Sequence, residues 1–275
     1  MKRILLNILC LAVVAVAITR CGTMQKVLKT GDHQLIYEQA LKYYNDEDWG
    51  RASTLFQSVE HLYTGTERED SISYFIARSK AKDRDYYGAI ELLEEFRREF
   101  GRSVFIEDAE AMYAMCYYYL SPGPTRDQST TLQAMNAIYE FVSRYPNSER
   151  NKDFLEIVDK LQGRLYEKSY LNAYTYYKIG RPKSAIIAFR NALKEYPETT
   201  FREEITYHIV ASSYELAKNS ILSKQEDRYL SLLDSYYTFV ADYPESKHKK
   251  SVNKMAQEAR DYLAKKEKEK ENKEK

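Results

Sequence analysis

The side chains that could carry out chemistry are few and widely spaced in this 275-residue chain. Its four histidines are His33, His61, His208 and His248. Adjacent acids such as Glu94 and Glu95 fall at helical positions, where we interpret them as a solvated face. The spacings typical of a zinc site, a phosphate-binding glycine loop or a nucleophile elbow do not occur. We therefore expect no catalytic residues, no metal site and no cofactor, and a protein that acts by binding rather than as an enzyme.

One cysteine stands where a covalent modification is expected. The chain begins with the basic run Met1-Lys2-Arg3, and residues 4–18 are apolar apart from Asn7. This run is shorter than the roughly 20 residues of a membrane-spanning helix, but it fits a secretory signal peptide. Cys21 follows directly and resembles a bacterial lipoprotein box, in which the thiol is lipidated (palmitate) and becomes the mature N-terminus. We predict a lipoprotein signal peptide at 1–20, lipidation at Cys21 and a lipid-anchor linker at 21–32.

Arg20 departs from the lipoprotein pattern, because a small residue usually precedes the cysteine. Two other outcomes therefore stay open. Ordinary signal peptidase could cut after Ala15-Val16-Ala17 and give a soluble periplasmic protein, or the segment could remain as a weak anchor. We favour lipidation because one of only three cysteines lies at this junction. Cys116 lies in an apolar helical stretch and is interpreted as a small core residue.

The composition favours helices and argues against a nucleic-acid partner. Only 9 glycines and 6 prolines occur, and strand-and-turn folds need more of both. The formal net charge is +1, and loss of residues 1–20 with their three cationic side chains would bring it from +1 to −2. A chain this close to neutral lacks the basic field of a nucleic-acid binder.

Similar segments recur along the chain. Four of them end with an aromatic residue and then glycine or proline, at Phe100-Gly101, Tyr145-Pro146, Tyr196-Pro197 and Tyr243-Pro244. A weaker ending lies at Tyr63-Thr64. Proline cannot continue a helix, and the aromatic side chain can fill the joint between stacked units. These endings resemble those of the tetratricopeptide repeat, a helix–turn–helix of about 34 residues.

Aligning the five repeats on their last position places the same residue types together. The eighth position of the repeat, in its first helix, is Ala40, Ala77, Ala114, Ala173 and Ala211. The twentieth position, in the second helix, is Ala52, Ala89, Ala134, Ala185 and Leu232. We therefore predict an all-α fold, a right-handed superhelix of five tetratricopeptide-type helix pairs within one domain at 33–265. Its last part, at about 246–265, is expected to be a C-terminal capping helix, followed by a charged, disordered tail at 266–275.

Two repeats are longer than the regular pattern. The eighth and twentieth positions are 12 residues apart in repeats one, two and four, but 20 apart in repeat three and 21 in repeat five. We expect the additional 8 and 9 residues to lie in the turns between helices, at 121–131 and around 219–228.

Tyrosines gather at the positions that usually face the concave side of such repeats, the fifth, ninth and twelfth of the first helix. Tyrosine offers a large contact area at low rotamer cost and a hydroxyl for backbone groups. We predict a peptide-binding groove lined by Tyr37, Tyr44, Tyr74, Arg78, Tyr118, Tyr170, Tyr174 and Tyr177. The alternative is that these tyrosines pack between neighbouring repeats.

The chain resembles the BamD (ComL) family of outer membrane β-barrel assembly lipoproteins over nearly its whole length. The resemblance rests on Cys21, the five repeats, the insertion after 116–120, the repeated Tyr-Pro-x-Ser endings and the run at 127–130. The abundant tyrosine and the run at 26–29 look most like members from the Bacteroidetes group. The resemblance implies a protein tethered by an N-terminal lipid to the periplasmic face of the outer membrane. It also implies docking of the C-terminal repeats on a BamA-like barrel subunit with periplasmic domains, and an N-terminal groove that receives unfolded outer membrane protein clients.

A second hypothesis keeps the repeats and changes the partner. The chain could be another periplasmic repeat lipoprotein, such as a secretin pilotin or a coordinator of cell division or cell-wall synthesis. We favour the assembly scaffold, because insertions in repeats three and five are less expected in a plain adaptor with a regular period.

Overall fold

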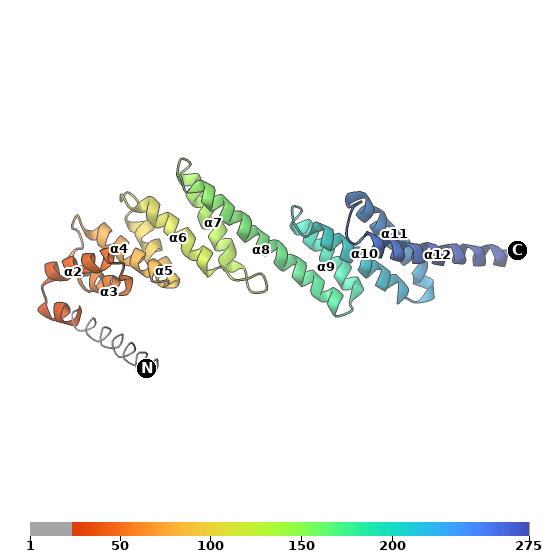
Figure 1. The fold of residues 1–275 in the computed structure, drawn as a ribbon, viewed down its shortest axis with the longest axis horizontal. Coiled ribbons are helices and arrows are strands. Elements are labelled where there is room, and N and C mark those ends of the chain that lie inside the picture. The colour runs from red at the N-terminus through yellow and green to blue at the C-terminus, as the bar shows by residue number, and fades with distance from the viewer. Residues whose placement is uncertain (1–23, 275) are drawn as a thin grey trace, which may run out of the picture. The chain divides into compact units, whose positions relative to one another are not determined.

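The computed structural model describes residues 24–274, and within that range every regular element is a helix (Figure 1). The predicted signal peptide and Cys21 lie outside the described residues. Residues 24–30 are helical. The elements that follow are α2 (His33–Asn45), α3 (Trp49–Val59), the short η1 (Glu60–Leu62), α4 (Glu69–Lys82), α5 (Tyr86–Glu99), α6 (Ile106–Leu120), α7 (Ser129–Arg144), α8 (Asn151–Lys178), α9 (Pro182–Glu195), α10 (Arg202–Lys218), α11 (Leu222–Asp242) and α12 (Lys249–Glu274).

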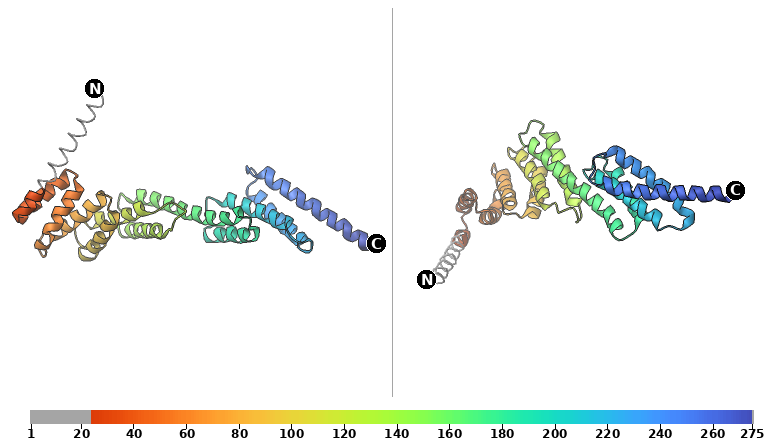
Figure 2. Two further views of the ribbon diagram at one scale, coloured as in Figure 1. Left: turned by 90° about the horizontal axis from the view of Figure 1, so that it is seen from below. Right: turned by 45° about the vertical axis from the view of Figure 1, so that its right-hand side comes forward.

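Consecutive helices pack as pairs, which confirms the predicted all-α fold of helix pairs (Figure 2). The residues at the eighth and twentieth positions of the repeats, alanine in every case except Leu232, are all buried. Small side chains at these places let the two helices of a pair approach closely, and larger residues such as Phe56, Phe96 and Phe189 fill the space beside them. Local sequence also determines several helix starts: Asp32 caps α2 with its carboxylate, and Pro182 opens α9.

The chain divides into two compact units rather than the single repeat domain that the sequence suggested. Among the described residues, unit 1 comprises 24–122 together with 129–158, and unit 2 comprises 123–128 together with 159–274. The division falls within α8, whose 28 residues make it twice as long as a typical repeat helix. In unit 1, Phe154 of α8 packs edge-on against Phe141 of α7, and in unit 2, Tyr170 of α8 packs against Phe189 of α9.

The two insertions behave differently. The first is a loop at 121–128, as expected, and the Gln128 side chain donates hydrogen bonds to the carbonyl groups of Gly123 and Arg126. The second is not a loop, because α11 already begins at Leu222 and takes up most of the additional residues as helix. The first insertion holds Pro122, Gly123 and Pro124, which disfavour helix, whereas residues 222–228 contain neither residue type.

Both ends of the described chain are more regular than predicted. Residues 24–30 are no free linker, since Met24, Val27 and Leu28 pack against the core of the first helix pair. At the other end, where the sequence suggested a disordered tail at 266–275, α12 continues as helix to Glu274. Lys270 of this extension lies 2.7 Å from Glu226 of α11. No helix among residues 24–274 combines the length and apolarity that a membrane span requires.

Candidate functional site

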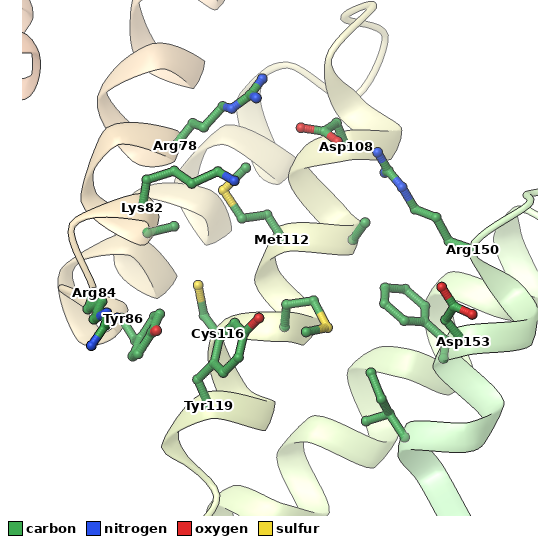
Figure 3. A pocket seen from close by; sticks show the side chains of 15 residues that line it. Arg78, Lys82, Arg84, Tyr86, Asp108, Met112, Cys116, Tyr119, Arg150 and Asp153 are labelled. Carbon is green, nitrogen blue, oxygen red and sulfur yellow. Dashed lines mark hydrogen bonds and ion pairs between the residues drawn. The ribbon is translucent and has the colours of Figure 1, made fainter. Parts of the chain in front are cut away.

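A groove opens on the first-helix side of unit 1, with a volume of about 930 Å³ (Figure 3). Its walls come from α4, from α6 and from the beginning of α8. The floor is largely apolar and is formed by Ala81, Tyr86, Ala111, Met112, Met115, Cys116, Tyr119, Phe154 and Ile157. Methionine side chains adapt their shape to varied apolar partners, so this floor suits a flexible chain rather than one rigid ligand.

The charged residues of the groove are mainly cationic. Four cations lie along it, and only two carboxylates oppose them: Arg78, Lys82, Arg84 and Arg150 face Asp108 and Asp153. Asp108 is engaged by an ion pair with Arg150, which reaches toward it from the start of α8 (Figure 3). Within the described part of the chain, neither Lys82 nor Arg84 forms an ion pair. The groove therefore carries positive charge that is available to an anionic ligand.

Arg78 is held by the tyrosines beside it. Its guanidinium donates a 3.2 Å hydrogen bond to the Tyr74 hydroxyl and lies 5.7 Å from the ring centre of Tyr44. The Tyr74 hydroxyl donates in turn to Asp108. Burial, and then this bond to the carboxylate, raise the pKa of Tyr74 well above its ordinary value, so the hydroxyl stays protonated. The chain from Arg78 through Tyr74 to Asp108 fixes one end of the groove.

The predicted tyrosines of unit 1 do not line this groove, although Arg78 does. Tyr74 is only 2% exposed and stacks on Phe105 with ring centres 4.5 Å apart, so its ring is packed between helices. Tyr44 is half-buried against Trp49 and Phe75, and Tyr37 is half-buried against Phe56 and Tyr63. Tyr118 is half-buried beside Tyr119.

The groove opens where the concave positions hold alanine instead of tyrosine. Ala81 is the twelfth position of repeat two, and Ala111 is the fifth position of repeat three. Where tyrosine or phenylalanine side chains are present, they close the space between first helices by packing on one another. Ala81 and Ala111 have no side chain long enough to fill that space, and both line the groove together with Met115. The sequence signal for the groove was therefore the interruption of the tyrosine pattern.

The predicted tyrosines of unit 2 form an aromatic cluster around a histidine. Tyr174 and Tyr177 each meet the His208 ring edge-on with ring centres 4.9 Å apart, and Tyr170 lies 6.0 Å from it. His208 Nδ1 lies 2.7 Å from the carbonyl oxygen of Glu204. Burial lowers the pKa of His208, which favours the neutral ring. The structure thus brings the three tyrosines together but packs them half-buried against this ring.

Two other kinds of site have no support in the described residues. No cluster of metal-ligating side chains occurs between residues 24 and 274. Cys116 is buried at the floor of the groove, and burial raises the pKa of its thiol to about 12. A thiol that stays protonated at neutral pH is a poor nucleophile.

Comparison with known proteins gives consistent relatives. A family model described as outer membrane lipoprotein, YfiO, matches residues 29–228 and 172–270. The chain is 24% identical over 197 residues to the putative outer membrane protein assembly factor BamD of Aquifex aeolicus, a match that covers 70% of this chain and 64% of the relative. It is 23% identical over 186 residues to BamD of Caulobacter vibrioides, covering 68% and 61%. It is 22% identical over 205 residues to BamD of Rickettsia prowazekii, covering 74% and 79%. The chain thus spans less than two thirds of the first two relatives.

Two solved structures are also similar, each at 13% identity. The complex of the TPR2AB domain of yeast Sti1 with pHSP90 has a TM-score of 0.38 and covers 84% of this chain and 99% of that one. The TPR domain of P58(IPK) has a TM-score of 0.40 and covers 88% and 68%. The family model, which matches well over half of the sequence, is the finding that decides membership. The chain belongs to the YfiO family of outer membrane lipoproteins.

Proposed function

We propose that this protein is a lipid-anchored scaffold of the outer membrane β-barrel assembly machinery, without catalytic activity of its own. It holds unfolded outer membrane protein clients in the groove of unit 1 and docks on the barrel-forming, BamA-like core subunit. Three relatives named as BamD assembly factors support this role. The observation that carries the client-binding part is the groove itself, with its methionine-rich floor and its surplus of cations.

The groove matches the chemistry of an unfolded barrel strand. Such strands alternate apolar and polar residues and are rich in aromatic residues near the membrane interfaces. An extended segment can therefore place every second side chain on the apolar floor. Lys82 and Arg84, which lack ion-pair partners among the described residues, can attract a carboxylate such as the C-terminus of the client. No nucleotide is needed in this scheme, because folding of the client supplies the free energy.

Docking on the core subunit is assigned to unit 2. This unit exposes several large apolar side chains, namely Ile179, Ile187, Ile221, Leu222, Leu230 and Tyr237. Large exposed apolar side chains can contribute to interaction surfaces. A partner domain that covers them would leave the groove of unit 1 free for clients.

The assembly role is tested by purifying the native protein from membranes in mild detergent and identifying its partners by mass spectrometry. We expect a large outer membrane barrel protein with periplasmic domains to co-purify. Recovery of a secretin or of cell-wall enzymes instead would contradict the assembly role and favour an adaptor in another pathway. The same sample reports by its mass whether Cys21 is lipidated.

Client binding is tested with a labelled synthetic peptide that ends in phenylalanine with a free carboxylate. Replacing Lys82 and Arg84 by glutamine should weaken binding about 5–30-fold, as expected for the loss of two partly exposed charge contacts of about 0.5–1 kcal/mol each. The double variant Lys183→Gln and Lys194→Gln on α9 of unit 2 is the matched control and should bind normally. If the unchanged protein bound the same peptide with an amidated C-terminus as tightly as the peptide with a free carboxylate, recognition of the carboxylate by these two residues would be ruled out.

A further inference from the structure

We infer that the helix at 24–30 and the first turn of α2 form a membrane-contacting surface, which holds the first helix pair against the phosphate headgroups of the lipid bilayer. The inference rests on lipidation of Cys21, which belongs to the proposed function. It goes beyond that function by assigning a surface and an orientation to the N-terminal end of unit 1.

The first observation is that residues 24–30 are docked on the folded unit. Met24, Val27 and Leu28 pack against the buried core of the first helix pair, which includes Ile36 and Ala40. These three residues lie on one side of a helical turn, as the i, i+3, i+4 spacing requires. Gly31 has a positive φ of 67°, which turns the chain directly into α2, where Asp32 caps the helix. The segment therefore moves as part of unit 1.

The second observation is the short distance to the anchor along the chain. Only Gly22 and Thr23 separate Cys21 from Met24. Whatever their conformation, three residue steps span at most about 11 Å. The polar headgroup layer on one side of a bilayer is itself roughly 5–8 Å thick. Lipid attached to Cys21 thus holds the docked helix within or directly beside that layer.

The third observation is the chemistry of the face left uncovered. Gln25, Lys26, Lys29 and Thr30 are exposed on the helix. Lysine side chains near a membrane surface are attracted to anionic headgroups, and both lysines have stems long enough to reach phosphate groups. Leu35, in the first turn of α2, is 41% exposed and follows this helix after a short turn. The surface is polar with one apolar side chain, which fits contact with headgroups rather than insertion into the hydrocarbon.

The test uses the full lipidated protein, reconstituted into vesicles of phosphatidylethanolamine and phosphatidylglycerol that contain a lipid with a headgroup quencher. Single cysteines carry a fluorophore at position 26 (Lys26→Cys), at position 35 (Leu35→Cys) or, as a distant control, at position 136 (Asn136→Cys). Cys116 is buried, and the thiol of a lipidated Cys21 is blocked. We expect strong loss of fluorescence at 26 and 35 and little loss at 136. Equal fluorescence at 35 and 136 would overturn the inference.

A second pair of variants tests whether docking causes the contact. Replacing Val27 and Leu28 by serine should release the helix from the core. Quenching should then persist at position 26 and fall at position 35, while Gln25→Ser on the exposed face leaves both unchanged. Unchanged quenching at 35 after release would show that the docked helix does not hold the pair there.

The mass of the purified protein separates this inference from the proposed function. A protein lipidated at Cys21 but not quenched at position 35 would refute the membrane-contacting surface alone. A protein without lipid at Cys21 would refute both the anchor and the surface, and the assembly role would still be decided by its co-purifying partners.

Discussion

The hydroxyl of Ser148 donates a 2.7 Å hydrogen bond to Oε1 of Glu107, and so ties the turn before α8 to the first turn of α6. The same contact recurs along the chain. Ser103 donates to Asp70 at 2.7 Å, and Ser246 donates to Glu203 at 2.6 Å. In each case the serine closes a repeat, and the acid lies in the first turn of the first helix of that same repeat. These bonds tie the turn that leads into the next helix to the first helix of the preceding pair.

Loss of one such contact should destabilise the unit that contains it. Ser246→Ala removes the bond to Glu203 in unit 2, where the hydroxyl is partly buried. We expect a loss of about 1 kcal/mol in the free energy of unfolding, as is typical of a single hydrogen bond. Urea unfolding followed by circular dichroism measures it. Ser231→Ala, on the exposed side of α11, is the control, and an equal effect of both variants would deny a special role to the contact.

A buried carboxylate stabilises unit 1. Glu110 of α6 is only 3% exposed, pairs with Arg144 of α7 and lies 3.7 Å from Arg97 of α5. Glu110→Ala would leave the partly buried Arg97 without this partner, and we expect a loss of about 2–3 kcal/mol, below the range for fully buried pairs because Arg144 is largely exposed. The fluorescence of Trp49, the single tryptophan and a residue of α3, reports unfolding of this unit. The exposed Glu95→Ala serves as control. An unchanged midpoint of urea unfolding for Glu110→Ala would contradict a stabilising role for this carboxylate.

Filling the groove should block client binding with little loss of stability. Tyrosine occupies the twelfth position in repeats one, three and four, whereas repeat two has Ala81 there. Ala81 is only half-buried and lines the groove, so Ala81→Tyr has space for its ring. We expect peptide affinity to fall about tenfold or more, which corresponds to about 1.4 kcal/mol. Ala188→Tyr, at a half-buried position of α9 in unit 2, is the control for a general effect of an added tyrosine.

The stability of unit 2 should depend on pH through His208. Burial lowers the pKa of this ring from its ordinary 6.5, so the folded state binds a proton less readily than the unfolded state. The contribution is present above the unfolded pKa and is lost as the pH falls below about 6.5 toward the lower folded pKa. His208→Phe should remove this part of the pH dependence in urea unfolding followed by near-ultraviolet circular dichroism. An identical pH profile for the variant would show that His208 is not the group responsible.

The thiol of Cys116 should resist modification while unit 1 is folded. Burial raises its pKa to about 12, and the thiolate is the reactive form. We expect a thiol-specific reagent at neutral pH to modify the folded protein far more slowly than the urea-unfolded protein. Rapid modification under native conditions would mean that the floor of the groove opens to solvent.

The sequence by itself determined the helix pairs. Five alanines at the eighth position and four at the twentieth predicted where helices meet, and all of them are buried. Pro182 and Asp32 likewise determine helix starts through the backbone of their own segment. These features were predictable because they depend on residues close in the chain, and the repeat shows the same requirement five times.

Only the tertiary structure decided which surfaces remain open. Tyr74 was expected in a groove, yet it is buried because Phe105 and Asp108 of the next helix pair lie against it. The groove formed instead between Ala81 and Ala111, whose small size matters only because the two helices face each other. The docking of residues 24–30 likewise depends on the core of the helix pair that follows them. Exposure is a property of which side chains meet across helices, and a periodic pattern along one helix does not contain that information.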